Sequence, residues 1–122
     1  MHTDQSQQHS IHQAINIGLQ LREIIAEHSE GKMNHREYQI LEFVVEEYLA
    51  HRRVVMEQGM GLKHLGSRYT LRKSIQTLID HNFLAIEYSE DSRLRPLVPT
   101  EHALHLFAAI GDRISRLVVT ST

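Results

Sequence analysis

The chain of 122 residues has no cysteine. This absence excludes a disulfide framework, a thiol nucleophile, a cysteine-ligated zinc site and a thiol redox switch. The sequence also has no apolar run that approaches the about 20 residues of a membrane-spanning helix. The polar, histidine-rich residues 1–13 contain no basic region followed by an apolar stretch, so no secretory signal is evident. We therefore expect a cytoplasmic protein without membrane contact.

The composition is that of one ordinary globular domain. Hydrophobic residues make up 41% of the chain and charged residues 23%, as in typical domains. At this length, folding buries roughly two-thirds of the surface of the unfolded chain, which is enough for a core without covalent staples. We expect a disordered lead over residues 1–10 and a single domain over residues 11–122.

The formal net charge of −2 conceals an uneven distribution. Residues 1–62 carry five Lys and Arg against nine Asp and Glu, residues 63–95 carry six against four, and residues 96–122 carry two against two. A net negative chain argues mildly against nucleic acid as a partner. However, the distribution of charge matters more than its sum for steering a charged partner, and the positive excess lies in the middle third.

Two helices are predicted in the N-terminal part of the chain. Apolar residues recur at helical spacing over residues 11–28, after which Gly31 is a stop signal. A second apolar stripe with a period near 3.6 covers residues 34–52. Its first residues, Asn34 and Glu37, have the spacing of a capping box, which marks the start of a helix.

The middle of the chain has the features of two helices joined by a tight turn. Residues 54–56 are apolar and predict either a short strand or the entry to a third helix. Residues 62–65 look helical, and Gly66 stands where a C-cap glycine would. Ser67 is a suitable N-cap for an amphipathic helix over residues 68–81.

The apolar period then changes from about four residues to two. Residues 84–88 alternate between large and small or charged side chains, as in a strand, and residues 94–98 can return as a second strand. Pro96 predicts that this second strand lies at the edge of its sheet. Thr100 is a suitable cap for a last helix that runs to about residue 118.

This order of elements predicts a winged helix-turn-helix, in the class of mainly α folds with a small β-hairpin. A short helix, a glycine-bearing turn and a second helix form the helix-turn-helix, and the hairpin directly after it would be the wing. Within the domain, we assign the N-terminal helices to residues 11–52, the helix-turn-helix and wing to residues 54–99, and a C-terminal dimerisation helix to residues 100–118.

Residues 62–103 resemble the MarR-type winged-helix regulators of bacteria. The shared pattern is a recognition helix with Thr and a small apolar residue in its first turn, a wing with Asp-x-Arg at its tip, and a strand that ends in Thr. Asn82 stands where the family usually has glycine, and the C-terminal dimerisation region is trimmed to one helix. The residues that carry the resemblance are Thr70, Leu71, Leu78, Asn82, Phe83, Leu84, Asp91, Arg93 and Thr100.

The resemblance implies a transcriptional repressor that binds double-stranded DNA as a homodimer at a roughly palindromic site. It also implies a small-molecule effector, because such regulators often hold a small ligand between the dimer helices and the DNA-reading part. No cofactor is expected. The broad apolar stripes of the first and last helices are the candidate dimer interface. The predicted interface residues are Ile15, Ile24, Phe107, Ile110, Ile114 and Leu117.

The polar face of the helix over residues 68–81 is the predicted DNA-reading surface. A helix that enters the major groove keeps its apolar face for its own core and presents long hydrogen-bonding side chains opposite. A charged hairpin tip suits the phosphate backbone or a narrow minor groove, and Asp91 would orient Arg93 there by a charge-assisted bond. The predicted DNA-binding residues are Arg68, Tyr69, Arg72, Lys73, Gln76, Arg93 and Arg95.

Other interpretations remain open at this point. The rival function is a winged-helix protein–protein interaction module or adaptor, which the acidic N-terminal half favours, and Asp91 with Arg93 would then be a surface ion pair of small value. A ligand- or metal-responsive sensor is a second rival. His102 and His105 have helical metal-ligand spacing, but no further ligands are identifiable, so we predict no metal site. The serines lack elbow glycines and a matched base, so we predict no enzyme.

Overall fold

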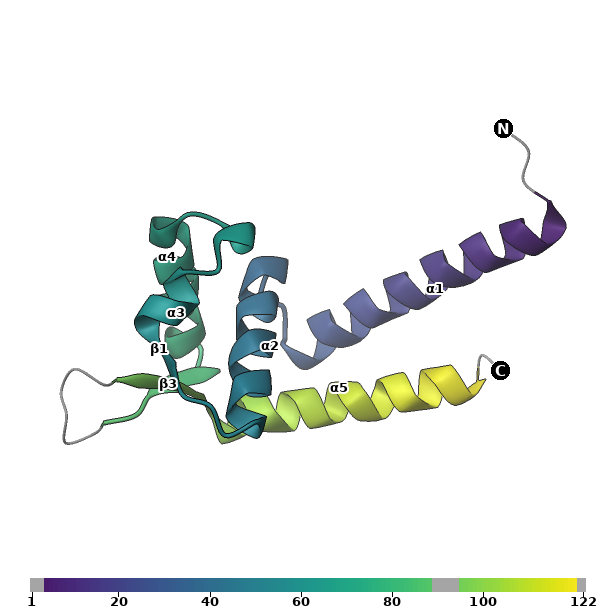
Figure 1. Ribbon diagram of the computed structural model, residues 1–122. Coiled ribbons are helices and arrows are strands. Elements are labelled where there is room, and N and C mark those ends of the chain that lie inside the picture. Colours follow the sequence, from purple (N-terminus) through teal and green to yellow (C-terminus); the bar gives the residue numbers. More distant parts are fainter. Residues whose placement is uncertain (1–3, 89–94, 121–122) are drawn as a thin grey trace.

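The computed structural model describes residues 4–88 and 95–120. Figure 1 shows α2, α3, α4 and the sheet gathered into one body, from which α1 and α5 project to the same side. This confirms the predicted fold class, which is mainly helical with a small antiparallel sheet. The elements are α1 (Gln5–His28), α2 (His35–Leu49), β1 (Val54–Val55), α3 (Met56–Met60), the 3₁₀ turn η1 (Lys63–Leu65), α4 (Arg68–Asp80), β2 (Leu84–Ile86), β3 (Pro96–Pro99) and α5 (Glu101–Thr120).

Helix α1 begins earlier than the apolar pattern predicts. The carboxylate of Asp4 accepts a hydrogen bond from the backbone N–H of Gln7 at 2.7 Å, and the helix starts at Gln5. The prediction of a disordered lead is therefore wrong for residues 5–10. An aspartate N-cap satisfies an unpaired amide at the first turn and so starts a helix before any apolar stripe begins.

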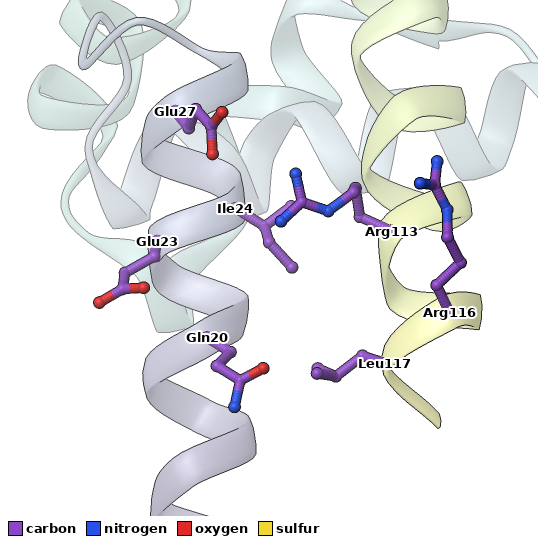
Figure 2. Close-up of a pocket in the computed structure, with 7 residues that line it drawn as sticks. All are labelled: Gln20, Glu23, Ile24, Glu27, Arg113, Arg116 and Leu117. Atoms are coloured by element: carbon purple, nitrogen blue, oxygen red, sulfur yellow. The ribbon is translucent and has the colours of Figure 1, made fainter. Parts of the chain in front are cut away.

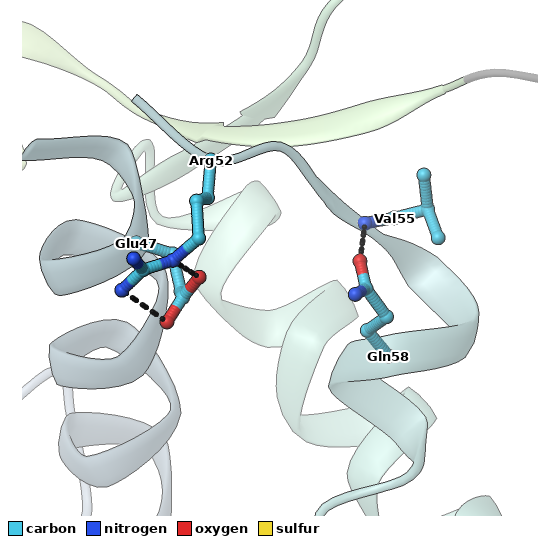
Figure 3. Close-up of polar contacts among 4 residues, drawn as sticks. All are labelled: Glu47, Arg52, Val55 and Gln58. Carbon is cyan, nitrogen blue, oxygen red and sulfur yellow. Dashed lines mark hydrogen bonds and ion pairs between the residues drawn. The ribbon is translucent and has the colours of Figure 1, made fainter. Parts of the chain in front are cut away.

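Helix α2 starts with the predicted capping box and ends three residues earlier than predicted. The side chain of Asn34 accepts from the N–H of Glu37, and the side chain of Glu37 accepts from the N–H of Asn34, both at 2.8 Å. At the other end, His51 adopts a left-handed φ of 60°. The guanidinium of Arg52 then folds back onto the carboxylate of Glu47 at 2.6 Å (Figure 3), which holds the chain outside the helix.

The segment after α2 forms both of the elements that its sequence allowed. Val54 and Val55 make a short strand, and α3 follows directly. The side-chain carbonyl of Gln58 accepts from the N–H of Val55 at 2.9 Å (Figure 3) and so closes the first turn of α3. Gly59 is buried, and a Cβ on it would lie 2.9 Å from Cδ1 of Ile75. The glycine thus lets α3 pack closely on α4.

The three strands form an antiparallel sheet in the order β1-β3-β2. Leu97 of β3 pairs with Val54 on one side and with Ile86 on the other. The prediction that Pro96 places its strand at an edge is therefore wrong. Proline is tolerated because it is the first residue of β3, where its carbonyl still accepts from the N–H of Glu87 at 2.9 Å.

The core lies where α2, α4 and the start of α5 meet the sheet. Leu78 is only 1% exposed, as the apolar period of its helix predicts. Within the described residues, none of the helices has both the length and the apolar character needed to cross a lipid bilayer. The largest buried side chains are Phe83, Ile40, Leu41, Leu71, Ile75, Leu78, Leu84 and Ile110.

Candidate nucleic-acid interface

The start of α4 is fixed by a serine cap after a glycine turn. Gly66 adopts a φ of +152°, a conformation that favours glycine. The hydroxyl oxygen of Ser67 accepts from the N–H of Thr70 at 3.2 Å, and its hydroxyl donates to that of Thr70 at 3.0 Å. The predicted N-cap is confirmed, and it sets the rotation at which α4 leaves the turn.

The two faces of α4 have opposite character. Leu71, Ser74, Ile75 and Leu78 are buried against the body of the domain. The side chains on the outer face are all exposed, and they come from five positions that follow each other around one side of the helix. These are the five predicted DNA-binding residues of the helix, Arg68, Tyr69, Arg72, Lys73 and Gln76.

Several side chains on this outer face are held by neighbours. The ammonium group of Lys73 lies 4.7 Å from the ring centroid of Tyr69, at cation–π distance. The side-chain amide of Gln76 donates to the carboxylate of Asp80 at 2.9 Å. Arg72 makes no hydrogen bond or ion pair within the described part of the chain, so its five N–H donors are available to a ligand.

Arg68 is paired with an acid from the preceding helix. Its guanidinium contacts the carboxylate of Glu57 on α3 at 2.6 Å. The sequence carried no signal for this pair, because it depends on how α3 packs against α4. An acid therefore stands beside one of the predicted phosphate contacts.

The hairpin that follows α4 is described only at its base. Arg95, directly before β3, is exposed as a contact residue requires. Asp91 and Arg93 lie outside the described residues, so the predicted contacts at the wing tip stay predictions. Tyr88, at the other side of the hairpin base, is 89% exposed.

The end of α4 is joined to the start of α5. Asn82 adopts the left-handed conformation predicted for it, with a φ of 63°. The hydroxyl of Thr100 donates to the carbonyl of Asn82 at 2.6 Å, and its oxygen accepts from the N–H of Ala103 at 3.1 Å. Thr100 thus caps α5, as predicted, and ties it to the end of α4.

The predicted dimer residues lie in different environments. Ile24 is 4% exposed and Ile110 is 2% exposed, so both side chains are covered by the chain's own core. Phe107 stacks on Tyr38 with ring centroids 5.4 Å apart. Ile15, by contrast, is 54% exposed. Ile114 and Leu117 are partly buried, and the role of these residues in an interface stays a prediction.

A charged groove of ≈ 430 Å³ separates the two projecting helices. Arg113 reaches from α5 toward Ile24 of α1, whereas Glu23 points away from α5 in this view (Figure 2). The helices α1 and α5 diverge beyond this point (Figure 1), and Leu117 of α5 lines a further pocket with His12 and Asn16 of α1. The lining residues are Gln20, Glu23, Ile24, Glu27, Arg113, Arg116 and Leu117.

A larger cavity of ≈ 660 Å³ lies between α1 and α2. Burial there, followed by the charge of Glu42, raises the pKa of Tyr38 to about 12. Burial also raises the pKa of the Glu42 carboxyl. The lining joins a cation to apolar surface and comprises Arg22, Ile25, Ala26, Met33, Asn34, His35, Tyr38, Gln39 and Glu42.

The histidines do not assemble into a metal centre in the part of the chain that is described. No group of three or more His, Asp or Glu side chains there has the geometry to hold a metal ion. His102 instead stacks on Phe83, with ring centroids 5.0 Å apart. This aromatic contact gives His102 a packing role at the start of α5.

The glycine turn at Gly66, helix α4 with its exposed outer face, and the strands β2 and β3 follow each other in this order. This arrangement defines a winged helix-turn-helix protein. Among solved structures, the chain is similar to Staphylococcus aureus MarR in complex with salicylate and kanamycin. The TM-score is 0.58 at 22% sequence identity, over 94% of this chain and 77% of that chain. No family model matches the sequence, and no curated protein matches it. The likeness therefore shows a MarR-like fold.

Proposed function

We propose that the protein is a sequence-specific transcriptional regulator that binds double-stranded DNA, a repressor of the MarR type in the bacterial cytoplasm, and not an enzyme. One observation carries the proposal. Helix α4 buries Leu71, Ile75 and Leu78 on one face and exposes five long polar or basic side chains on the other. A helix that reads the major groove has this division. The similarity of the fold to a MarR protein supports the same function.

Two residues of α4 suit base recognition. The guanidinium of Arg72, which has no hydrogen-bond or ion-pair partner among the described residues, matches the two acceptors of a guanine edge. Gln76 gives one N–H to Asp80, which leaves its carbonyl and second N–H for an adenine edge. Arg68 and Tyr69 lie at the start of the helix, where we expect backbone contacts, and Lys73 stands beside Arg72 on the outer face. Arg93 and Arg95 would hold the adjacent backbone or minor groove from the wing.

A homodimer would place two such helices on the two halves of a palindromic site. The apolar side chains of Ile11, Ile15 and Leu19 are 45%, 54% and 49% exposed and recur every four residues along α1. A stripe of this kind on a projecting helix supports pairing with a second copy. The partner would cover the diverging ends of α1 and α5.

The cavity between α1 and α2 is the candidate site of a small-molecule effector. The similar S. aureus MarR structure is a complex with salicylate, an aromatic acid, and kanamycin. Arg22 and the half-buried phenol of Tyr38 offer a cation and a hydrogen-bond donor beside apolar surface. A ligand of the folded state raises the melting temperature, so salicylate should do so for the wild type and not for Arg22→Ala.

Selection of bound duplexes from a random pool tests the main proposal. Enrichment of one sequence, with affinity that falls steeply as salt rises, is the expected result, because phosphate contacts release counterions. No enrichment together with salt-insensitive retention would instead favour a protein–protein interaction module. The same experiment gives the sequence of the site.

A further inference from the structure

The connection between α1 and α2, together with the first turn of α2, is hydrogen-bonded to the chain on both sides of α4. Nε of Arg36 donates to the backbone carbonyl of Leu65 at 2.7 Å. Nδ1 of His81 lies 3.1 Å from the backbone carbonyl of Lys32. Leu65 ends the turn that precedes α4, and His81 is the C-cap residue of α4. Residues 32–36 therefore contact the chain on both sides of the helix.

The contact of Arg36 fixes the turn from which α4 starts. The guanidinium lies over Gly66, since a Cβ built there would be 3.4 Å from Nε of Arg36. The carbonyl of Leu65 cannot rotate without breaking this bond. Because Ser67 caps α4 only two residues later, the bond also restrains the start of the helix, where Arg68 and Tyr69 stand.

The contact of His81 restrains the other end. A carbonyl only accepts, so Nδ1 must carry the proton. The titratable side chains of Lys32 and Asp80 are not needed for this bond, since the acceptor is a backbone atom. The end of α4, with Gln76 one turn before it, is thereby tied to the α1–α2 connection.

We propose that Arg36 and His81 are positioning residues that hold α4 at both ends, so that Arg72 and Gln76 meet DNA in one orientation. This proposal rests on the proposed function. The core contacts of α4 keep the helix folded without these two bonds. Glu57 and Thr100 contact its ends from α3 and α5, and Arg36 and His81 add a restraint from the side of α1 and α2. Preorganisation of a binding surface raises affinity for the correct partner, because less ordering is required on binding.

Binding measurements with paired variants test the proposal. Arg36→Ala and His81→Ala should each weaken binding to the selected duplex by about fivefold, the loss expected for one hydrogen bond. Binding to a scrambled duplex should change little, so the ratio of affinities for the selected and the scrambled duplex should fall by the same factor. Arg36→Lys and His81→Asn retain a donor for the same carbonyl and should restore most of the preference. His105→Ala, at an exposed position of α5, is the control and should behave like the wild type.

The salt dependence separates positioning from direct contact. The slope of affinity against salt should be unchanged in all variants, because a positioning residue releases no counterion. A slope reduced by about one would mean that the residue contacts a phosphate, and this would overturn the proposal. Equal preference in wild type and both alanine variants would overturn it as well.

Hydrogen exchange of the free protein makes the test independent of DNA. The backbone amides of residues 66–70 and 79–82 should exchange faster in the two alanine variants than in the wild type, and the conservative variants should restore protection. Unchanged exchange contradicts the proposal. If the wild type binds no duplex at all, the proposed function fails, whereas the exchange rates still decide whether the two residues hold the helix.

Discussion

The carboxylate of Glu57 on α3 lies 2.6 Å from the guanidinium of Arg68 on α4, although both side chains are more than half exposed. Arg68 must exchange this partner for a phosphate if it binds DNA. An exposed ion pair contributes little to stability, about 0.2–1 kcal/mol. The acid therefore affects what Arg68 can bind more than it affects the fold.

Glu57→Gln should accordingly strengthen DNA binding. Removing one negative charge beside the phosphate contact should raise affinity for all duplexes by about two- to fivefold at low salt, and the gain should shrink as salt screens the interaction. The unfolding free energy should change by less than about 1 kcal/mol. Glu46→Gln, an exposed acid of α2, is the matched control. Fluorescence anisotropy at two salt concentrations measures the DNA affinity of both variants. Weaker DNA binding by Glu57→Gln than by the wild type would contradict the expectation.

Arg72 and Arg93 should have different roles: we expect Arg72 to contact base edges and Arg93 to contact the DNA backbone. Arg72→Ala should cost about 1–3 kcal/mol on the selected site and relax the preference at one or two positions. Arg93→Ala should weaken all duplexes evenly and reduce the salt slope by about one, with Asp91→Ala acting in the same way but less. Binding curves on matched and scrambled duplexes distinguish the two patterns. Three variants that behave like the wild type would mean that the basic face is only solvated surface.

The orientation of the reading face depends on the burial of Leu78. Leu78→Ala should lower the unfolding free energy by about 2–5 kcal/mol, since the side chain is almost completely enclosed. Leu49→Ala is the control, because Leu49 is 67% exposed, and its effect should stay within about 0.5 kcal/mol. Urea unfolding followed by circular dichroism gives both values. Equal effects at the two positions would contradict the burial of this face.

Helix α4 could be predicted from the sequence because its signals are local. The Ser67 cap, the apolar period of α4 and the left-handed Asn82 all act within a few residues of each other. For the same reason the five side chains of its outer face were identified correctly as one surface. Their role in binding DNA stays a prediction.

Other features depend on packing between distant segments and had no local signal. The central position of β3 follows from pairing with Val54, far earlier in the chain, whereas Pro96 on its own predicts an edge. From the sequence, Gly59 only weakens a helix prediction. Its close approach to Ile75 of α4, which explains the glycine, depends on tertiary packing. Arg36 and His81 bond to backbone carbonyls. Because every residue has a backbone carbonyl, the sequence does not indicate which one will be the acceptor.

Assembly can be tested on the exposed stripe of α1 without disturbing the core. Ile15→Glu combined with Leu19→Glu should give monomers, because like charges would face each other across an apolar seam. Both side chains are about half exposed, so the folded chain should tolerate the change. Tyr69→Glu with Gln76→Glu adds the same charge on the outer face of α4, away from α1 and α5, and should leave the assembly of the free protein unchanged. Light scattering at micromolar concentration measures the mass of the assembly. A monomeric wild type would contradict the proposed homodimer.

The last prediction concerns the phenol of Tyr38 beside the α1–α2 cavity. Burial, with a smaller effect of the Glu42 charge, raises its pKa from 10.0 to about 12. A raised pKa in the folded state contributes stability that is complete below the unfolded value. This stability is lost as the pH rises from about 10 toward about 12. Wild type should therefore lose up to about 1 kcal/mol relative to Tyr38→Phe between pH 9 and pH 11, a figure reduced for partial exposure.

Two measurements check this behaviour of Tyr38. Urea unfolding of wild type and Tyr38→Phe at the two pH values gives the difference in free energy directly. Absorbance at 295 nm should show that Tyr38→Phe lacks the phenol that ionises at the highest pH. Glu42→Gln should lower the pKa of Tyr38, because it removes the second cause of the shift. A free-energy difference that stays constant with pH would mean that Tyr38 is solvated, and the cavity would then offer no desolvated donor to an effector.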